Sequence, residues 1–393
     1  MRERSCEVLI FGGGFAGLWI LDSLVREGYD ALLLESRALG AGQSIQAQGI
    51  IHGGGKYALR GVSDFAAVKA IREMPERWRR SLSGQQQPDL SPALLLSDVC
   101  HLFVPRAGML SRLSAHALLP VVRKAGLLHA GPVKLSVEQW PRALQGSARA
   151  VYSMTEPVIA TGSALAVLAA RHPRRLLRYA PGESLENLKL DLKQVGEYTV
   201  EIEDPEVEGK LRLRPKAVVF AAGAGNEGLV RRSECGAAPM QRRPLRMSML
   251  RGSLPPLYAH MVRGGKTAMT VTTHPLQADS MADNAGQCIW QLGGELAERS
   301  AGEAGAGILE RELPRQLRRF FPGVDFSRVL MASYSAVRAE ARSRDQRRPS
   351  GVQVKELCPG VLVAWPTKMA LSPILAREVY AELNRVLSPS ERR

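Results

Sequence analysis

The sequence predicts an α/β protein whose first part is a Rossmann-type nucleotide-binding domain. An apolar run over residues 8–11 leads into a glycine-rich turn, and a helical pattern follows over residues 18–27. A second apolar run, residues 31–34, ends at the acid Glu35. Strand, G-x-G-x-x-G turn, helix, strand and acid, in this order, make up the dinucleotide-binding fingerprint in the context that it requires.

Each residue of the turn has a physical role in binding a dinucleotide. Gly12 lets the chain turn sharply, Gly14 lets a pyrophosphate approach the backbone, and Gly17 lets the helix pack closely on the strand. Phe15 and Ala16 begin the helix, whose free N–H groups and dipole attract phosphate. The turn is therefore expected to hold the pyrophosphate.

The acid at the end of the second strand indicates an unphosphorylated adenosine ribose. Glu35 follows Gly17 at the distance where a carboxylate accepts hydrogen bonds from both ribose hydroxyls. A 2′-phosphate there would meet a like charge. Ser36, the next residue, belongs to the same expected contact.

Small residues dominate the segment 39–55, as expected where a backbone packs along an extended ligand. Here the sequence resembles the D-amino-acid oxidase superfamily of flavoproteins, in which this segment runs along FAD toward the isoalloxazine. Residues 50–54 with Tyr57 are similar to the glycerol-3-phosphate dehydrogenase branch, whereas later segments are similar to glycine oxidase. The resemblance implies a Rossmann-type FAD-binding domain with a second, mixed-sheet α+β substrate domain.

The resemblance also implies how FAD is held. Some relatives tether their flavin through a histidine three positions before the glycine that matches Gly49. This chain has Gln46 at that position, so non-covalent FAD is expected. The expected FAD contacts of the segment are Gln43, Ser44, Gln48, Gly49 and Ile50.

Composition limits the class of protein. With 393 residues, 45% of them hydrophobic and 23% charged, the chain can bury a large core and is not disordered throughout. Its five cysteines lie far apart without a C-x-x-C pair, which argues against a metal cluster or a disulfide scaffold and favours the cytoplasm. No segment is apolar for long enough to predict a transmembrane helix.

The net charge of +15 has several explanations. RNA, an anionic membrane surface, an anionic substrate and an arginine-rich proteome all fit it, and charge alone does not choose among them.

The order of elements predicts an FAD-binding domain made of residues 1–85, 150–235 and 335–393. Residues 86–149 and 236–334 are expected to form the substrate domain. The expected elements of the first half are helices over 64–82, 110–125 and 161–171, strands over 93–104 and 133–140, and a hairpin of 198–203 with 210–214. The resemblance places a short strand that contacts adenine after the helix at 161–171.

A second glycine-rich turn follows a buried strand over residues 217–222. Gly223, Gly225 and Gly228 formally repeat G-x-G-x-x-G, which would bind NADPH if an arginine met its 2′-phosphate. The candidates for that role are Arg242 and Arg243. No acid-tipped strand follows and prolines interrupt the next segment, so the turn is expected beside the FAD pyrophosphate, as in the superfamily. Its expected contacts are Ala222, Gly223 and Gly225.

The second half is expected to complete both domains. Strands over 245–251, 267–272 and 288–292 and a helix over 306–320 belong to the substrate domain, and a strand over 360–365 precedes the last helix, 372–387. Ser372 is the expected N-cap and Pro373 the first helical residue. In the superfamily this helix points its positive end at the flavin pyrimidine ring. The expected contacts are Thr367, Lys368 and Met369.

Three side chains are candidates for the chemistry. Arg338 stands where glycine oxidase-like enzymes carry Gly-Leu-Arg-Pro, whose arginine binds the substrate carboxylate, and the alternative is an ion pair with Glu340 or Glu356. Lys368 either stabilises negative charge at the flavin or is an exposed lysine. His52 is either a base toward a substrate hydroxyl or a structural histidine. Sequence spacing does not separate catalysis from packing for Tyr258, His260, His274 and Tyr334.

The sequence therefore predicts an FAD-dependent oxidoreductase that removes a hydride from a small, anionic amine or amino acid. No metal is expected. The alternative reaction is oxidation of a hydroxy acid or of glycerol-3-phosphate, which His52 and Lys368 favour. A tRNA-modifying FAD oxidoreductase, with the same fold and an RNA partner, is a third hypothesis, and a flavin-bound scaffold without turnover is a fourth.

Overall fold

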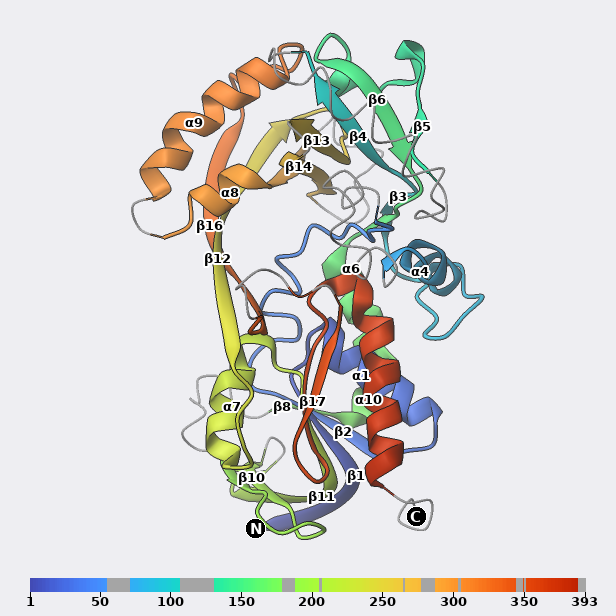
Figure 1. The fold of residues 1–393 in the computed structure, drawn as a ribbon, viewed down its shortest axis with the longest axis vertical. Helices are drawn as coiled ribbons and strands as arrows, with labels where there is room; N and C mark the ends of the chain where they lie inside the picture. Colours follow the sequence, from blue (N-terminus) through green and yellow to red (C-terminus); the bar gives the residue numbers. More distant parts are fainter. Residues whose placement is uncertain are drawn as a thin grey trace.

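The chain folds into two parts that lie one above the other along the long axis of the molecule, as the computed structural model shows (Figure 1). Each part is built around its own large sheet. The structure describes residues 1–54, 71–106, 131–178, 188–204, 207–263, 266–276, 287–302, 305–343, 349 and 351–387. The predicted α/β class, with a mixed sheet in the second part, is confirmed.

The sheet of the lower part has a parallel centre. β1 pairs in parallel with β11 and β2, and β11 pairs in parallel with β18. Because parallel strands end at the same edge, the turns after β1 and β11 and the end of β2 lie side by side. The strands in spatial order are β17 (Gln353–Cys358), β18 (Val361–Trp365), β11 (Lys210–Phe220), β1 (Arg2–Phe11), β2 (Ala31–Glu35) and β8 (Leu176–Arg178), with β10 (Thr199–Glu203) and β9 (Lys189–Asp191) added at β11.

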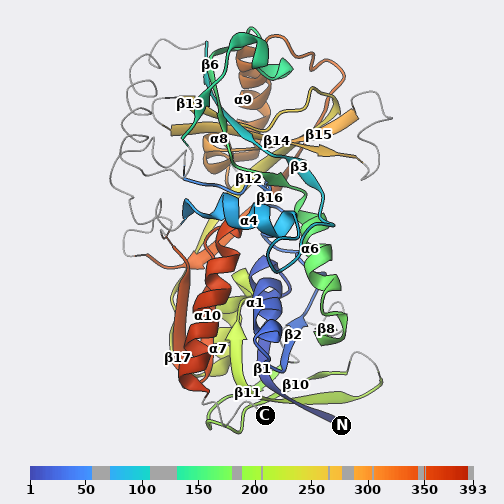
Figure 2. The ribbon, with the colours of Figure 1, turned by 90° about the vertical axis from the view of Figure 1, so that its right-hand side faces the viewer.

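Helices cover both faces of this sheet (Figure 2). Val8 and Ile10 of β1 face α1 (Phe15–Arg26), α10 (Ser372–Val386) and α6 (Thr161–Ala170). Leu9 and Phe11 face the opposite side, where α7 (Asn226–Ser233) packs. Burial on both faces explains why these strands are continuous apolar runs in the sequence. In the described part of the chain, no helix is long and apolar enough to cross a membrane.

The sheet of the upper part is also mixed. β13 pairs in parallel with β4, and the other neighbouring strands of this sheet pair antiparallel. Leucines of α9 (Gly305–Phe320) pack on its outer face. Its strands in spatial order are β16 (Leu330–Ala341), β12 (Met240–Ser253), β15 (Gln287–Gly293), β14 (Lys266–Pro275), β13 (Ala259–Arg263), β4 (Cys100–Pro105), β6 (Ala148–Met154) and β5 (Val133–Lys134). Smaller elements between the parts are α4 (Met74–Leu82), β3 (Leu95–Ser97), β7 (Val158–Ile159) and α8 (Glu295–Arg299).

A long antiparallel ribbon of β12 and β16 connects the two parts (Figure 1). The two strands pair without interruption from Met240 with Ala341 to Arg251 with Leu330. The predicted domain boundary between residues 334 and 335 falls inside β16. The chain therefore returns to the lower part along a continuous strand rather than through a loop.

Several predicted elements differ from the structure. Residues 93–104 form two strands, β3 and β4, and 210–222 contain one strand, β11, instead of two. Only Val133–Lys134 of the segment 133–140 is extended, because a capping box between Ser136 and Gln139 starts a 3₁₀ turn. The helix expected at 110–125 and the first part of that expected at 64–82 lie outside the described residues.

The N-cap prediction for the last helix is wrong. Leu371 is the N-cap of α10, and Ser372 is already helical. The Ser372 hydroxyl donates to the Met369 carbonyl at 2.8 Å instead of accepting from the helix N-terminus.

Candidate functional site

The turn after β1 brings three backbones close together. Gly12 has φ +107°, and a Cβ on it would lie 2.5 Å from Cα of Ala222 at the end of β11. A Cβ on Gly17 would lie 1.8 Å from the carbonyl oxygen of Gly12, so only glycine lets α1 begin this close to β1. A Cβ on Gly14 would meet Oγ of Ser44 at 2.7 Å.

The N-terminus of α1 suits an anion. Its N-cap residue, Gly14, has no side chain to cap the helix, and the first turn contains no acidic residue. Ser44 Oγ accepts the N–H of Phe15 at 3.1 Å, which ties the segment after β2 to the start of the helix. The N–H groups and dipole of this first turn favour a phosphate group.

Glu35, the last residue of β2, fixes the glycine-rich turn after β1 through its carboxylate. Its Oε2 accepts the N–H of Gly13 at 2.7 Å, and its Oε1 accepts the N–H of Arg37 at 2.8 Å. Each carboxylate oxygen has a further lone pair, so two hydroxyl groups can still donate to it. The half-buried Ser36 lies between these contacts.

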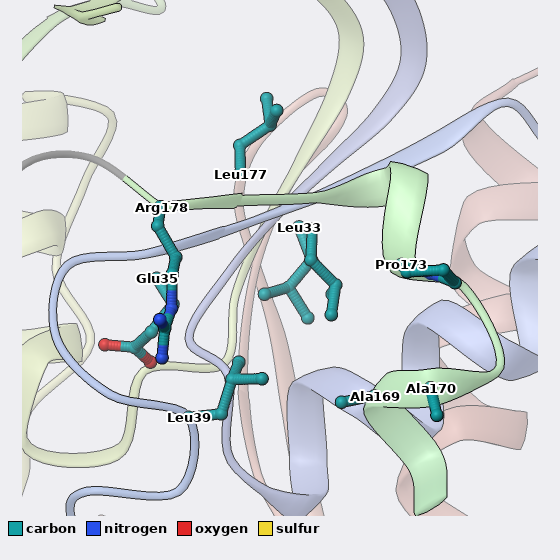
Figure 3. Close-up of a pocket in the computed structure, with 9 residues that line it drawn as sticks. Leu33, Glu35, Leu39, Ala169, Ala170, Pro173, Leu177 and Arg178 are labelled. Carbon is teal, nitrogen blue, oxygen red and sulfur yellow. The ribbon is translucent and has the colours of Figure 1, made fainter. Parts of the chain in front are cut away.

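A cavity of about 350 Å³ opens beside Glu35 (Figure 3). Glu35 and Arg178 are register partners on the parallel strands β2 and β8. Their side chains lie side by side at the cavity. Cavities of this size and lining hold small molecules. An apolar wall with one carboxylate at its edge suits a base and its ribose. The apolar lining includes Leu33, Leu39, Ala169, Pro173 and Leu177.

The segment 43–50 runs from this turn to the upper sheet, and glutamines fasten it to the ribbon. The side-chain amide of Gln43 accepts the N–H of Ala339 at 3.3 Å and donates to its carbonyl at 3.5 Å. Gln46 donates to the carbonyl of Ser335 at 3.4 Å. Gln43 and Gln46 thus bind the backbone of β16 at two positions, Ala339 and Ser335.

Gln48 and Gln291 continue these contacts onto the face of the upper sheet. Nε2 of Gln48 donates to the carbonyls of Gln291 at 2.9 Å and Thr270 at 3.2 Å. Nε2 of Gln291 donates to the carbonyl of Gln46 at 3.0 Å and to the hydroxyl of Tyr334. The side-chain amide nitrogen of Gln48 therefore donates its hydrogen bonds to the upper sheet. A ligand would contact Gln48 through its backbone.

Gly49 and Ile50 lie against β7. Gly49 has φ +73°, and a Cβ on it would lie 2.0 Å from the carbonyl oxygen of Ile159. Ile50 forms a single β-bridge with Val158. This close approach explains the glycine and fixes where the segment ends.

The loop between β18 and α10 contains a strained residue. Thr367 has φ +57°, which is rare for a β-branched side chain. Its Oγ1 is buried and has no hydrogen-bond partner among the described residues. Strain and an orphaned hydroxyl together fit a ligand at this point. Lys368 and Met369, both half-buried, follow and lead through a 3₁₀ turn into α10.

The second glycine turn fits the same site. Asn226 accepts the N–H of Ala222 at 2.7 Å and donates to the carbonyl of Ala364 at 3.2 Å, which ties β11 to β18. A Cβ on Gly223 would lie 3.1 Å from Nε2 of Gln43, and Gly225 closes the 3₁₀ turn that follows.

The two arginines after this turn already have acidic partners. Arg242 pairs with Glu227 at 2.7 Å, and Arg243 pairs with the buried Glu340 at 2.5 Å. These ion pairs favour the interpretation of a single nucleotide site over a separate NADPH site.

His52 lies under the upper sheet, beside two residues far away in the sequence. Its Nδ1 is 3.2 Å from Oε2 of Glu156, whose Oε1 accepts the N–H of Gly53 at 2.7 Å. The ring of His260 on β13 lies 5.3 Å from that of His52. Glu156 could not be selected from the sequence, because nothing in its local pattern shows that it meets His52.

Arg338 lies on the ribbon, away from His52. Its Nη1 is 3.3 Å from Oε1 of Glu298 on α8. The acids that the sequence suggested as alternative partners pair with other arginines, Glu340 with Arg243 and Glu356 with Arg385. Four strand-to-strand steps separate β16 from β13, so Arg338 and His260 lie on strands roughly 19 Å apart.

The remaining polar candidates line the face that meets the segment. Burial lowers the pKa of His274, although a hydrogen bond to Gln291 acts in the opposite direction, so the ring is neutral near pH 7. Burial raises the pKa of Tyr334 and raises that of Tyr258 to about 12, so both phenols stay protonated. None of these groups carries a charge at neutral pH.

Comparison with known proteins places this geometry in a family. The family model described as DAO, FAD dependent oxidoreductase, matches residues 7–380. A probable FAD-dependent oxidoreductase of Pseudomonas aeruginosa, PA4991, is 37% identical over 395 residues, which cover 99% of this chain and 94% of that protein. Its crystal structure matches with a TM-score of 0.76 over 100% of this chain and 93% of that one.

Two more distant structures share the fold. Glycine oxidase from Geobacillus kaustophilus matches at 17% identity and a TM-score of 0.66, over 98% of this chain and 96% of that one. L-alpha-glycerophosphate oxidase from Mycoplasma pneumoniae, solved with FAD bound, matches at 15% identity and a TM-score of 0.67, over 97% and 95%. FAD is therefore the cofactor of this chain. The chain belongs to the DAO family of FAD-dependent oxidoreductases.

Proposed function

We propose that this oxidoreductase acts on the C–N bond of a small, anionic amine or amino acid. The observation that carries the proposal is the position of Arg338. Along β16, Tyr334, Ala336 and Arg338 alternate onto one face, and Tyr334 on that face contacts the segment 43–50 through Gln291. A guanidinium on this face suits a substrate carboxylate.

Bound FAD supplies the oxidising chemistry by accepting a hydride. The protein's residues bind it, orient the substrate and handle the proton. The cavity beside Glu35 is proposed to hold the adenosine, and the α1 N-terminus the pyrophosphate. The orphaned hydroxyl of Thr367 and the start of α10 are proposed to meet the flavin. The residues proposed to hold FAD are Gly12, Gly14, Phe15, Ala16, Gly17, Glu35, Ser36, Gln43, Ser44, Gln48, Gly49, Ile50, Ala222, Gly223, Gly225, Thr367, Lys368 and Met369.

Acid precipitation should release all of the flavin into the supernatant. Gln46, at the position where some relatives carry a tethering histidine, donates to the carbonyl of Ser335 and has no nucleophilic atom to bond the flavin. The measurement is the absorbance of supernatant and washed pellet after precipitation with trichloroacetic acid. Colour that stays in the pellet would exclude non-covalent binding.

Arg338→Lys should lower kcat/KM about 10- to 150-fold with a carboxylate substrate. Lysine keeps the charge but loses the planar fork, and one charged hydrogen bond is worth about 1.5–3 kcal/mol. FAD affinity should not change, because the Arg338 guanidinium pairs with Glu298 on α8, which is not among the residues proposed to hold FAD. Stopped-flow reduction of the flavin under anaerobic conditions measures the effect.

Arg242→Lys is the matched control, since it lies on the partner strand of the ribbon in an exposed ion pair with Glu227. Its kcat/KM should stay within twofold of the parent. If Arg338→Lys also stays within twofold, Arg338 does not bind the substrate, and Lys368 becomes the proposed anion-binding residue.

Oxidation of a C–O bond is the second candidate, favoured by the pairing of His52 with Glu156. A hydroxyl must lose its proton as the carbon is oxidised, and a histidine held by a carboxylate is suited to accept it. An anaerobic panel of amines, amino acids, 2-hydroxy acids and glycerol-3-phosphate separates the two candidates. Bleaching of the flavin by hydroxy compounds alone would overturn the amine proposal.

A further inference from the structure

Three side chains from separate stretches of the chain meet below the upper sheet. Glu156 lies two residues before β7, His260 belongs to β13, and His52 follows the segment 43–50. One nitrogen or oxygen from each lies within 4.8 Å of the others. The nucleotide turn lies at one end of the segment and this cluster at the other. A ligand that extends from the turn along the segment therefore ends near His52.

Glu156 is a buried carboxylate with both oxygens facing donors. Its side chain is 4% exposed. The N–H of Gly53 donates to Oε1 at 2.7 Å, and Nδ1 of His52 faces Oε2 at 3.2 Å. A buried charge is costly unless hydrogen bonds or an opposite charge compensate it. The carboxylate thus fixes two consecutive residues, His52 and Gly53, at the end of the segment.

This contact determines which nitrogen of His52 carries the proton. An ionised carboxylate only accepts hydrogen bonds, so Nδ1 is the donor and Nε2 of the neutral ring is an acceptor. His52 is the most exposed member of the cluster, at 15% of its side chain. His260 is fully buried, with its Nδ1 2.8 Å from Oγ1 of Thr270. Of the three, His52 is the group that a substrate can reach.

We propose that Glu156 is a positioning residue that holds His52 in the tautomer whose Nε2 accepts a proton from the substrate. The inference rests on the second candidate function, oxidation of a C–O bond, because Arg338 lies on a strand roughly 19 Å from that of His260 and a small substrate held there does not reach His52. The O–H bond of a substrate hydroxyl breaks, its electron pair stays on the substrate oxygen, and an Nε2–H bond forms. The Glu156 carboxylate balances the charge of the resulting imidazolium.

Other polar groups around this pair come from three elements. His260 faces His52 from β13. Arg79 of α4 donates to the carbonyl of the residue before Glu156. Tyr258, just before β13, has a pKa that burial raises to about 12, and His101 of β4 has a pKa that burial lowers. Burial favours the neutral form of both side chains, and among the described residues Glu156 is the acidic side chain recorded beside His52.

A cation held by the same donors is the competing explanation. Two imidazoles and one carboxylate are a common ligand set for zinc and iron. The geometry favours the proton-handling pair, because Nδ1 of His52 and Oε2 lie at hydrogen-bond distance from each other and Oε1 accepts the N–H of Gly53. Metal analysis of the purified enzyme therefore belongs to the test.

The first arm needs no substrate. ¹⁵N-histidine-labelled holoenzyme carries seven histidines, and loss of signals in His52→Gln identifies the His52 ring. The parent should show a proton on Nδ1. In Glu156→Gln the amide can donate, so the other tautomer should gain population, and the titration midpoint of the ring should fall by about one to two pH units. Glu156→Asp should keep part of the parental behaviour.

Glu138→Gln, at an exposed position far from the cluster, is the matched control and should leave the His52 signals unchanged. The proposal is overturned if Glu156→Gln gives the parental tautomer and midpoint. It is also overturned if the purified enzyme holds stoichiometric zinc, iron or manganese whose removal shifts the His52 signals.

The second arm uses the best hydroxy compound of the panel. Glu156→Gln should lower kcat about 10- to 150-fold at neutral pH, with KM and the Kd for FAD within twofold. The acid limb of the pH profile should move to lower pH, because without the carboxylate the ring loses its proton more readily. An equal fall at every pH together with loss of FAD would show a purely structural role. If no hydroxy compound of the panel reduces the flavin, the second candidate function fails while the first arm still decides the role of Glu156.

Discussion

Asp22→Ala should lower the free energy of unfolding by about 3–5 kcal/mol. The Asp22 side chain on α1 is fully buried and meets Arg171 at 2.6 Å, Arg26 at 2.9 Å and His172 at 3.1 Å. These contacts join α1 to the chain that leaves α6 and enters β8. Removal of the carboxylate takes the acidic partner away from Arg26 and Arg171, close to the cavity that Ala169, Ala170 and Pro173 line.

The stabilisation by Asp22 should depend on pH. Burial by itself would raise the pKa of Asp22, but hydrogen bonds from His172, Arg171 and Arg26 outweigh it and lower the pKa to about 2. A carboxyl group whose pKa is lower in the folded state stabilises the fold above its unfolded pKa. The difference in stability between the parent and Asp22→Asn should therefore be full near pH 7 and shrink as the pH falls below about 4 toward 2.

Denaturant unfolding of the FAD-loaded protein, followed by circular dichroism and flavin fluorescence, measures both effects. Asp30→Ala is the matched control, because Asp30 pairs with Arg175 at 2.6 Å but its side chain is 53% exposed. An exposed ion pair contributes about 0–1 kcal/mol. A loss in Asp22→Ala no larger than that in Asp30→Ala would contradict the role of this network.

The nucleotide turn could be predicted from the sequence because its determinants are local. The strand, the glycines, the helix and Glu35 lie within 35 consecutive residues, and each constrains backbone geometry by itself. The helices α6, α9 and α10 were predicted for the same reason, with α9 starting one residue earlier than expected. Capping was less predictable: Ser136 and Gln139 carry a capping-box pattern that was overlooked, and Ser372 only imitates an N-cap.

The substrate side could not be predicted in the same way, because its contacts are long-range. Glu156 lies 104 positions from His52, and Arg338 lies 40 positions from Glu298. A sequence shows that such residues can ionise, but the pairing depends on how the two sheets are joined. The long strand β16 was missed because its first four residues are exposed and lack the apolar alternation of a half-buried strand.

Glu35→Ala should weaken FAD binding by at least about 150-fold. If Glu35 accepts both ribose hydroxyls, the substitution removes two charged hydrogen bonds of about 1.5–3 kcal/mol each, and about 3 kcal/mol corresponds to that factor in Kd. It also frees the N–H groups of Gly13 and Arg37, which the carboxylate now accepts at 2.7 and 2.8 Å. The turn would then lose part of its preorganisation for the pyrophosphate.

Titration of the apoprotein with FAD and, separately, with FMN tests this role, because FMN lacks the adenosine. FAD affinity should fall in Glu35→Ala, while FMN affinity stays within a factor of about three. Glu35→Gln should lie between the parent and Glu35→Ala, since an amide oxygen still accepts one bond without the charge. Glu27→Ala, at the exposed end of α1, is the matched control and should bind FAD as the parent does. Equal weakening of FAD and FMN would assign Glu35 to the stability of the turn alone, because a ribose contact can change only the binding of the ligand that carries the ribose.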